Sequence, residues 1–508
     1  MKIRPNFTLL SSTGVVMALV VSSMLSLPVA RAQQPANGAE FPATPVGKLA
    51  RSFVEAINSG DKERQASFIK SGYSDSVLKE TPMDELVSEL QKLSAQSGGF
   101  ELKSIIDSSP SEIRFLTRTK RGNIHVRMLM RVDKAQPDRL EGYGLRVVAD
   151  PEAEKANAWS REKMGDPEAI KEIERHVERA AREDRFSGVV LVAKGDSVIF
   201  NKAYGMAEKV FGAPNKVDTK FNLGSMNKMF TSVAIAQLVQ AGKLSYDDTL
   251  AKVLPEYPNK EVAGKVKVHH LLTHTSGLGD FFKPEFFQNR ERYRNPRDYF
   301  PIFANDALLF EPGTRWRYSN ASFIVLGAVV EKISGENYFD YVREHIFKPA
   351  GMNDTGSFAM DEVTPNLAVG YTRFGAGDPL GLEPRRANWM SLPLKGSPAG
   401  GGYSTAPDLL RFAQALRRNK LLSPELSEKI TSGSVDTGQG GPAKYGYGFS
   451  DELKGGKSVR GHSGGAPGIN SDLKIFWDGS YTVIVMGNYD PPAAQSLAGS
   501  IADFLARQ

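Results

Sequence analysis

The pair Ser225 and Lys228 is the strongest candidate for nucleophilic chemistry in this sequence. A serine becomes a good nucleophile when a nearby base accepts its proton, and a lysine with a lowered pKa can be that base. Ser225 opens a predicted helix over residues 225–241, which places Lys228 one turn later on the same face. The helix N-terminus and partial burial would both lower the pKa of Lys228. Other S-x-x-K sequences, among them those that begin at Ser67, Ser76, Ser160 and Ser471, lack such a helix.

The segment Tyr318-Ser319-Asn320 supplies groups that could assist the same reaction. It precedes a predicted helix over residues 322–333. A tyrosine hydroxyl is a poor base unless nearby cations lower its pKa, but close to Lys228 it could shuttle a proton between nucleophile and leaving group. Asn320 could hold a substrate amide or carbonyl through both ends of its side chain.

The third candidate segment is His462-Ser463-Gly464-Gly465, at the end of a predicted strand. A strand edge offers backbone N–H groups, and glycines allow a substrate to approach closely. The same residues also fit the G-x-S-x-G nucleophile elbow that starts at Gly461. That motif requires a following helix and a later histidine. Because the sequence offers neither, we reject the elbow.

Metal and thiol chemistry are not expected. His270 and His274 have the spacing of the zinc motif H-E-x-x-H, but Leu271 replaces the glutamate that activates water. We therefore expect these histidines to cap helices and anchor loops, and we expect no metal and no cofactor. The chain has 0 cysteines in 508 residues, which excludes disulfides, thiolate metal sites and a cysteine nucleophile.

The N-terminus has the features of a secretory signal peptide. Lys2 and Arg4 precede an apolar run over residues 15–27, and small residues occupy positions 30 and 32. We expect cleavage after Ala32, a periplasmic or secreted protein, and no stable membrane anchor, because a span needs about 20 apolar residues. Residues 1–32 hold three of the 64 Lys and Arg residues and no acid, so their removal lowers the net charge from +6 to +3. This mild charge argues against a nucleic-acid partner.

The remaining chain is expected to contain two domains. Residues 33–45 form a linker rich in Pro, Ala and Gln, residues 46–150 a small α+β accessory domain, residues 151–166 a charged linker, and residues 167–508 the main domain. In the accessory domain three helices are predicted first, the third over residues 82–96 with Thr81 as its N-cap. Four strands of an antiparallel sheet are predicted next, over residues 100–106, 112–119, 123–132 and 140–149.

The accessory domain resembles the cone-shaped α+β fold of the ketosteroid-isomerase and nuclear-transport-factor-two superfamily. The resemblance rests on the order of helices and strands and on residues 53–61, FVEAINSGD. It implies a domain that binds a small ligand or dimerises. Because no acid–base pair stands out, we expect a structural or substrate-capturing role.

The order S-x-x-K, Y-x-N, H-S-G resembles the serine β-lactamase and penicillin-binding-protein superfamily. The nearest branch is class C-like, with β-lactamase-related esterases, D-aminopeptidases and D-alanyl-D-alanine carboxypeptidases. Flanking segments also resemble this family, among them residues 221–225, 270–278, 311–313 and 400–405. The likeness covers residues 167–508. It implies an α/β fold with a five-stranded antiparallel sheet flanked by helices, a helical subdomain, and a site between them.

The resemblance also implies catalytic roles. Ser225 would be the acylated nucleophile and Lys228 its activator, Tyr318 would transfer protons, and His462 would take the place that lysine holds in many relatives.

Substrate binding is implied for Asn320, Ser463 and Gly464. The oxyanion hole would be formed by the backbone N–H groups of Ser225 and Gly465.

Three functions remain open on the sequence. The first is a secreted serine hydrolase acting on small esters or D-amino-acid peptides. The second is a class C-like β-lactamase, which His462-Ser463-Gly464 weakens because that class usually has Lys-Thr-Gly there. The third is a catalytically slow sensor of muropeptides or penicillin. Aromatic residues in segments 279–310 and 445–449 could line a substrate pocket or pack in the core, and the sequence favours neither.

Overall fold

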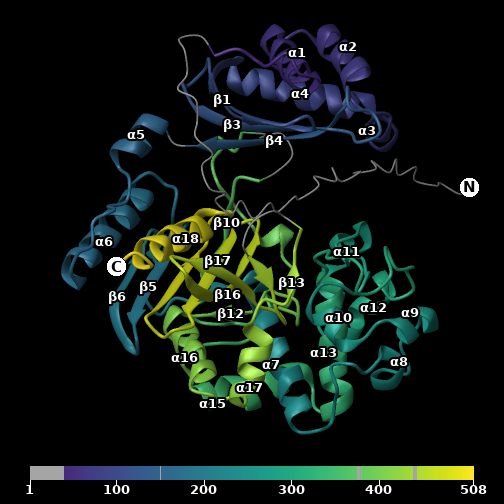
Figure 1. The fold of residues 1–508 in the computed structure, drawn as a ribbon, viewed down its shortest axis with the longest axis vertical. Coiled ribbons are helices and arrows are strands. Elements are labelled where there is room, and N and C mark those ends of the chain that lie inside the picture. The colour runs from purple at the N-terminus through teal and green to yellow at the C-terminus, as the bar shows by residue number, and fades with distance from the viewer. Residues whose placement is uncertain (1–38, 149, 375–377, 379, 439–442) are drawn as a thin grey trace, which may run out of the picture. The chain divides into compact units, whose positions relative to one another are not determined.

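The computed structural model describes residues 39–508, except residues 149, 375–377, 379 and 439–442. The predicted signal peptide lies outside the described residues. The described chain forms two compact units (Figure 1). One comprises Arg161–Tyr371 and Ala387–Gln508, and the other contains the described residues up to Ser160 together with those of Thr372–Arg386. None of the helices in the described part of the chain combines the length and the apolar character that a membrane crossing requires.

The N-terminal unit combines helices with a four-stranded antiparallel sheet, as predicted. The helices are α1 (Pro45–Ser59), α2 (Lys62–Gly72), α3 (Asp75–Glu80) and α4 (Met83–Ser97). The strands lie in the order β1 (Phe100–Ser108), β2 (Glu112–Thr119), β3 (His125–Val132) and β4 (Leu140–Val148). Every second residue of β2 and β3 is buried, and these side chains share one core with the helices. The alternation in the sequence therefore reflects a sheet with one covered face.

Two local predictions in this unit are wrong. Helix α3 was not predicted, and α4 begins at Met83 rather than after an N-cap at Thr81. The backbone N–H of Thr81 donates to the carbonyl of Val77 at 2.9 Å, so Thr81 is the C-cap of α3, whereas Pro82 stands at the N-cap position of α4. The predicted linker 151–166 also contains a short helix, α5 (Pro151–Ala156).

Thr372–Arg386 belongs to the N-terminal unit although it lies within the predicted main domain. Leu380 is 5% exposed and joins the apolar core of that unit. The Gln96 side chain on α4 donates to Asp378 at 2.8 Å and accepts from the backbone N–H of Leu380 at 3.2 Å. These contacts make the segment part of the N-terminal fold.

The C-terminal unit is centred on an antiparallel sheet in the order β13-β14-β15-β16-β17-β18-β5-β6 (Figure 1). The long strands are β5 (Gly188–Lys194), β6 (Ser197–Tyr204), β15 (Ser450–Lys454), β16 (Lys457–Ala466), β17 (Ile469–Phe476) and β18 (Tyr481–Gly487). The sheet has eight strands rather than the expected five, because β15 and the short β14 (Lys444–Tyr445) and β13 (Val435–Asp436) extend it beyond β16.

Helices cover the centre of this sheet. Helix α18 (Ala493–Leu505) packs on β17 and β18, α16 (Ala406–Arg417) packs on β18 and β5, and α6 (Asp166–Arg182) packs on β6. All residues of β18 are buried, as expected for a strand with helices on both faces.

The helical subdomain is organised around α7 (Asn227–Gln240) and α13 (Asn320–Ser334), which pack against each other and are buried over most of their length. The shorter helices around them are α8 (Leu250–Val253), α9 (Lys260–Lys265), α10 (Val268–Leu272), α11 (Pro284–Gln288), α12 (Phe300–Phe303), α14 (Tyr338–Val342), α15 (Lys348–Ala350) and α17 (Pro424–Thr431). Short strands complete the chain: β7 (Met206–Glu208), β8 (Ala213–Pro214), β9 (Phe221–Asn222), β10 (Tyr371–Thr372), β11 (Arg386–Ala387) and β12 (Tyr403–Ser404).

The packing of Leu380 predicts a specific loss of stability. Truncating a buried leucine to alanine costs about 2–5 kcal/mol, so Leu380→Ala should lower the midpoint of the thermal unfolding transition of the N-terminal unit. Leu382, in the same segment but 37% exposed, provides the matched control, and Leu382→Ala should have little effect. Equal effects of the two substitutions would contradict the assignment of Leu380 to this core.

Candidate active site

Ser225 lies in a tight turn directly before α7. The turn is a 3-10 helix, Gly224–Met226, so the predicted helix over 225–241 is in fact this turn followed by the α-helix. Asn222 holds the entry to the turn, because its side-chain oxygen accepts from the backbone N–H of Gly224 at 2.9 Å. Gly224 has φ 51°, a left-handed conformation that favours glycine. This turn places Lys228 in the first turn of α7, next to Ser225.

Lys228 is fully buried and its Nζ contacts three oxygens. These are Ser225 Oγ at 3.2 Å, Asn320 Oδ1 at 2.8 Å and the carbonyl of Ala399 at 2.5 Å. Burial lowers the pKa of Lys228 to about 7, although the negative charge of Asp280 opposes this shift. A substantial fraction of Lys228 is therefore neutral at neutral pH.

The partners of Lys228 determine where the neutral amine directs its lone pair. A neutral amine has two N–H donors and one lone pair, and the oxygens of Asn320 and Ala399 can only accept. Both N–H groups are therefore used by these two oxygens, which also make the shorter contacts. The lone pair remains for Ser225, whose hydroxyl can donate. This is the arrangement that a general base requires.

Tyr318 lies beside the same amine. Lys228 Nζ is 4.8 Å from the centre of the Tyr318 ring. Burial raises the pKa of the Tyr318 hydroxyl above its usual value, while a hydrogen bond with Ser225 acts in the opposite direction. The condition under which a tyrosine could act as a base, a lowered pKa, is therefore not met at Tyr318. Tyr318 keeps its proton and can donate or relay one, but it is not a tyrosinate base.

Asn320 begins α13, with Ser319 as the N-cap residue. Its amide orientation is fixed on both sides, because Oδ1 accepts from Lys228 and Nδ2 donates to Asp280 Oδ2 at 2.9 Å. Asp280 also accepts from the backbone N–H of Asn320 at 3.1 Å. Asp280 could not be recognised from the sequence, since one acid in an aromatic-rich loop carries no spacing signal.

The His462-Ser463-Gly464-Gly465 segment forms the end of β16, which packs against the turn of Ser225. A Cβ atom on Gly464 would lie 1.8 Å from the carbonyl oxygen of Leu223 and 2.9 Å from the backbone nitrogen of Ser225. Glycine is therefore required there so that the strand can approach the turn.

Of the groups predicted in this segment, Gly465 lies close to the turn of Ser225 and the Ser463 hydroxyl is engaged elsewhere. A Cβ atom on Gly224 would lie 2.8 Å from the backbone nitrogen of Gly465, so the two predicted oxyanion donors, Ser225 and Gly465, belong to backbones in close contact. The Ser463 hydroxyl is not brought to this group, because it accepts from Gln495 on α18 at 2.6 Å.

His462 is buried and makes two hydrogen bonds. Its Nδ1 is 2.5 Å from the carbonyl of Ser463 and its Nε2 is 2.9 Å from the Tyr445 hydroxyl. Burial, with a contribution from the positive charge of Lys228, lowers the pKa of His462 to about 3. With this pKa, His462 is neutral at neutral pH.

The histidines considered as zinc ligands have other roles. His270 Nδ1 accepts from the backbone N–H of Lys267 at 3.1 Å and so caps α10, as expected. His274 is buried beside Tyr318, with the two ring centres 4.1 Å apart. In the described residues, no group of three or more potential ligands forms a metal site.

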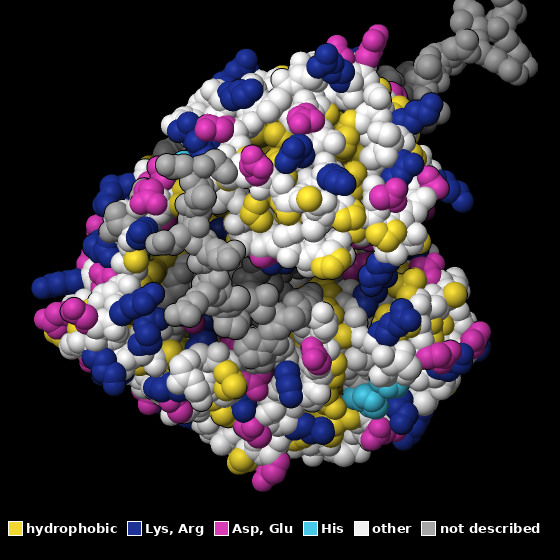
Figure 2. Space-filling model, turned by 45° about the horizontal axis from the view of Figure 1, so that its top comes forward, with side chains coloured by type: hydrophobic (Ala, Val, Ile, Leu, Met, Phe, Trp, Pro, Cys, Tyr) yellow, Lys and Arg dark blue, Asp and Glu magenta, His cyan; other side chains and the backbone are white. Residues whose placement is uncertain are grey.

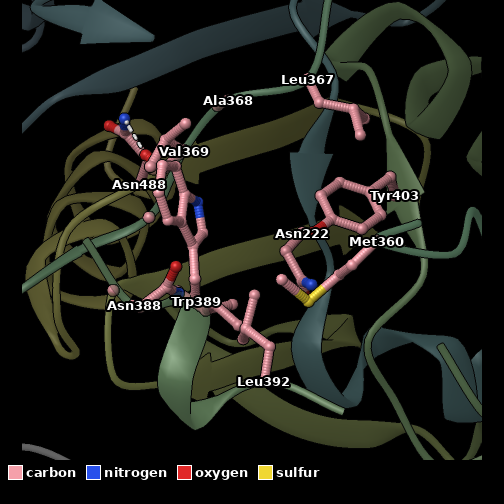
Figure 3. Close-up of a pocket in the computed structure, with 14 residues that line it drawn as sticks. Asn222, Met360, Leu367, Ala368, Val369, Asn388, Trp389, Leu392, Tyr403 and Asn488 are labelled. Atoms are coloured by element: carbon pink, nitrogen blue, oxygen red, sulfur yellow. Dashed lines mark hydrogen bonds between the residues drawn. The ribbon is translucent and has the colours of Figure 1, made fainter. Parts of the chain in front are cut away.

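A cavity of about 160 Å³ lies beside the strand that leads to the turn of Ser225 (Figure 3). Trp389 and Leu392 border it on one side, and Met360 and Tyr403 on the other. Asn222, which orients the turn, is also part of its wall. The aromatic segment 279–310 mostly packs in the core: Phe286, Tyr299 and Phe303 are among its buried residues, while Phe282 and Phe287 are about half exposed.

Comparison with known proteins gives one consistent result. Residues 173–507 match the Beta-lactamase family. Penicillin-binding protein 4* of Bacillus subtilis is 32% identical over 330 residues, which cover 63% of this chain and 71% of that protein. Esterase EstB of Burkholderia gladioli is 32% identical over 277 residues, covering 49% of this chain and 70% of the esterase.

A solved structure agrees with these sequence matches. The crystal structure of a penicillin-binding protein from Bacillus halodurans aligns with a TM-score of 0.58 and 32% identity, covering 64% of this chain and 98% of that one. The fold and the site define a hydrolase domain with a β-lactamase/transpeptidase-like architecture. The chain belongs to the Beta-lactamase family.

The lowered pKa of Lys228 predicts the pH dependence of acylation. Below its pKa of about 7 the amine is charged and cannot accept a proton. The acylation rate should therefore rise about tenfold per pH unit below pH 7 and level off above it. The measurement is the rate of labelling by a fluorophosphonate between pH 5 and 10, with Lys228→Arg as a control that should be nearly inert. A wild-type rate that keeps rising to pH 10 would contradict a neutral Lys228 base.

The close approach at Gly464 predicts a strong effect of one methyl group. Gly464→Ala should push β16 away from the turn of Ser225 and lower kcat/KM by about 100-fold or more. Gly499→Ala is the control, since a Cβ atom there meets no atom within 4 Å. Thermal unfolding would show whether the two variants remain folded. A folded Gly464→Ala variant with more than half of the wild-type activity would contradict the requirement for glycine at position 464.

Proposed function

We propose that this protein is an exported serine hydrolase that acts through an acyl-enzyme at Ser225 on small neutral esters or D-amino-acid peptides. The observation that carries the proposal is the contact of Lys228 Nζ with Ser225 Oγ, made by an amine whose pKa is lowered to about 7. An unreactive capping serine would have no need of a buried amine beside it.

Acylation begins with the transfer of the Ser225 proton to Lys228. Ser225 Oγ then forms a bond to the substrate carbonyl carbon, and the carbonyl oxygen becomes negative. The backbone N–H groups of Ser225 and Gly465 stabilise this oxyanion, a contribution of about 3–4 kcal/mol per donor in serine hydrolases. The tetrahedral intermediate collapses when the bond to the leaving group breaks.

The leaving group must receive a proton, and Tyr318 is placed to deliver it. Lys228 carries the proton taken from Ser225. Tyr318 stays protonated because burial raises its pKa, so it can donate its own proton to the leaving group and then accept a proton from Lys228. Deacylation uses the same groups in reverse, with water in place of the leaving group. Asn320 is held between Lys228 and Asp280, and the second N–H of its side-chain amide would donate to the substrate.

The neutral state of His462 favours substrates without a carboxylate at this position. The charged lysine of β-lactamases helps to hold the β-lactam carboxylate, whereas His462 has a pKa of about 3 and provides no positive charge at neutral pH. Lys228 is itself buried and engaged with Ser225 and Asn320. A substrate without a carboxylate at this position, such as a neutral ester, therefore fits the site better than a penicillin.

The rest of the chain supports an exported two-domain enzyme. Residues 1–32 carry the signal-peptide pattern, so we place the protein in the periplasm or outside the cell. Positive and negative side chains are interspersed on the face shown in Figure 2, which agrees with a small-molecule substrate rather than a nucleic acid. We assign the N-terminal unit to substrate capture or dimerisation.

A substrate panel tests this function directly. A nitrophenyl ester, a D-alanyl anilide and nitrocefin would be compared with wild-type protein and with Ser225→Ala, which should reduce every turnover by at least about 1,000-fold. We expect the ester or the anilide to be cleaved well above nitrocefin. Preferential turnover of nitrocefin would favour a β-lactamase, and wild-type protein that is neither labelled nor active would favour a sensor.

A further inference from the structure

His274, Tyr445 and His462 form a continuous chain of hydrogen bonds next to the site. His274 Nε2 is 3.1 Å from the Tyr445 hydroxyl, and the same hydroxyl is 2.9 Å from His462 Nε2. All three side chains are at least nine-tenths buried. Tyr445 comes from the short strand β14, and neither it nor His274 contacts the nucleophile in the mechanism described above.

The two ends of this chain fix the position of every proton in it. At one end the backbone N–H of Ser319 donates to His274 Nδ1 at 3.1 Å, so the proton of a neutral His274 lies on Nε2 and points to Tyr445. At the other end the carbonyl of Ser463 can only accept, so the proton of His462 lies on Nδ1. Nε2 of His462 then accepts, and the Tyr445 hydroxyl must donate to it.

Both histidines are neutral when the chain is formed in this way. Burial is the main cause that lowers the pKa of each, and the positive charge of Lys228 on α7 adds to it in both cases. Burial also raises the pKa of the Tyr445 hydroxyl, which therefore keeps the proton that it donates. A charged histidine at either position would have two N–H donors and would break the chain at Tyr445 or at Ser319.

The chain links the surroundings of Tyr318 to the β16 segment. His274 has φ 58° and holds the Tyr318 segment, because its ring packs on Tyr318 and its carbonyl accepts from the backbone N–H of Arg317 at 2.9 Å. His462 is the first residue of the β16 segment that reaches the turn of Ser225. Tyr445 connects these histidines, one on each segment.

We propose that Tyr445 and His274 are positioning residues, which hold the proton-transferring Tyr318 at a fixed distance from the oxyanion strand β16 through the hydrogen-bonded chain to His462. The proposal deepens the proposed function and rests on it. Tyr318 acts on the leaving group, whereas the β16 backbone stabilises the oxyanion. A small change in the distance between them therefore affects the transition state more than substrate binding.

The first test removes one hydroxyl and leaves the ring. Tyr445→Phe should lower kcat by about 10- to 100-fold on the best substrate of the panel, with KM changed by less than about threefold and with an unchanged melting temperature within a few degrees. Tyr447→Phe, two residues away and outside the chain, is the matched control and should behave as wild type. A kcat of Tyr445→Phe within twofold of wild type would overturn the proposal, as would an equal loss in the control.

A second variant tests whether the groups act as one chain. His274→Asn suits the left-handed backbone at this position, since asparagine adopts it readily, but its shorter side chain cannot reach Tyr445. We expect the double variant with Tyr445→Phe to lose less than about threefold more than the worse single variant, because either change breaks the same connection. Multiplicative losses would show independent roles and would overturn the proposal.

A measurement independent of turnover determines which nitrogen atoms carry the protons. Imidazole ¹⁵N signals of histidine-labelled protein at pH 7, assigned with His462→Gln, should show His462 neutral with its proton on Nδ1. A proton on Nε2, or a charged ring, would overturn the proposal even in an active enzyme. If wild-type protein shows this pattern but cleaves no substrate, the proposed function fails while the arrangement of the chain stands.

Discussion

The burial of one amine is the constraint on which the rest of this site depends. Lys228 can act as a base only while the surrounding protein keeps water away and supplies acceptors for its two remaining protons. Asn320 and the carbonyl of Ala399 supply these acceptors, and Asp280 fixes the direction of the Asn320 amide. Asp280 also limits the lowering of the Lys228 pKa, because its negative charge favours the protonated amine. The pKa therefore stays near neutrality.

The sheet and the helical subdomain meet at this amine because the backbone permits very close contacts. Gly464 lets β16 reach the turn of Ser225, and Gly224 lets that turn bend toward β16. Gly465, one of the two proposed oxyanion donors, and the proposed base Lys228 are thereby fixed to different elements, β16 and α7, whose separation is set by packing rather than by flexible side chains. Such preorganisation is what allows backbone dipoles to stabilise developing charge without moving.

Much of this arrangement could be predicted from the sequence, because periodicity and motif order are local signals. The fold class agrees with the structure, and the family is confirmed by the match over residues 173–507. The two-residue strands β13 and β14 and the six-residue helix α3 were missed because they are short. Thr372–Arg386 was misplaced because the tertiary contacts of Leu380 carry no local pattern. The neutral state of His462, the protonated state of Tyr318 and the role of Asp280 follow from burial and distance, which a single sequence does not show.

The most direct test of the account is the ionisation of Lys228 itself. Selective ¹³C labelling of lysine, with the Lys228 signal assigned by its absence in Lys228→Arg, would follow the carbon next to Nζ as a function of pH. The account predicts a titration midpoint near pH 7 in the free enzyme. A midpoint above pH 10, the ordinary range of an exposed lysine, would contradict the claim that a neutral Lys228 activates Ser225.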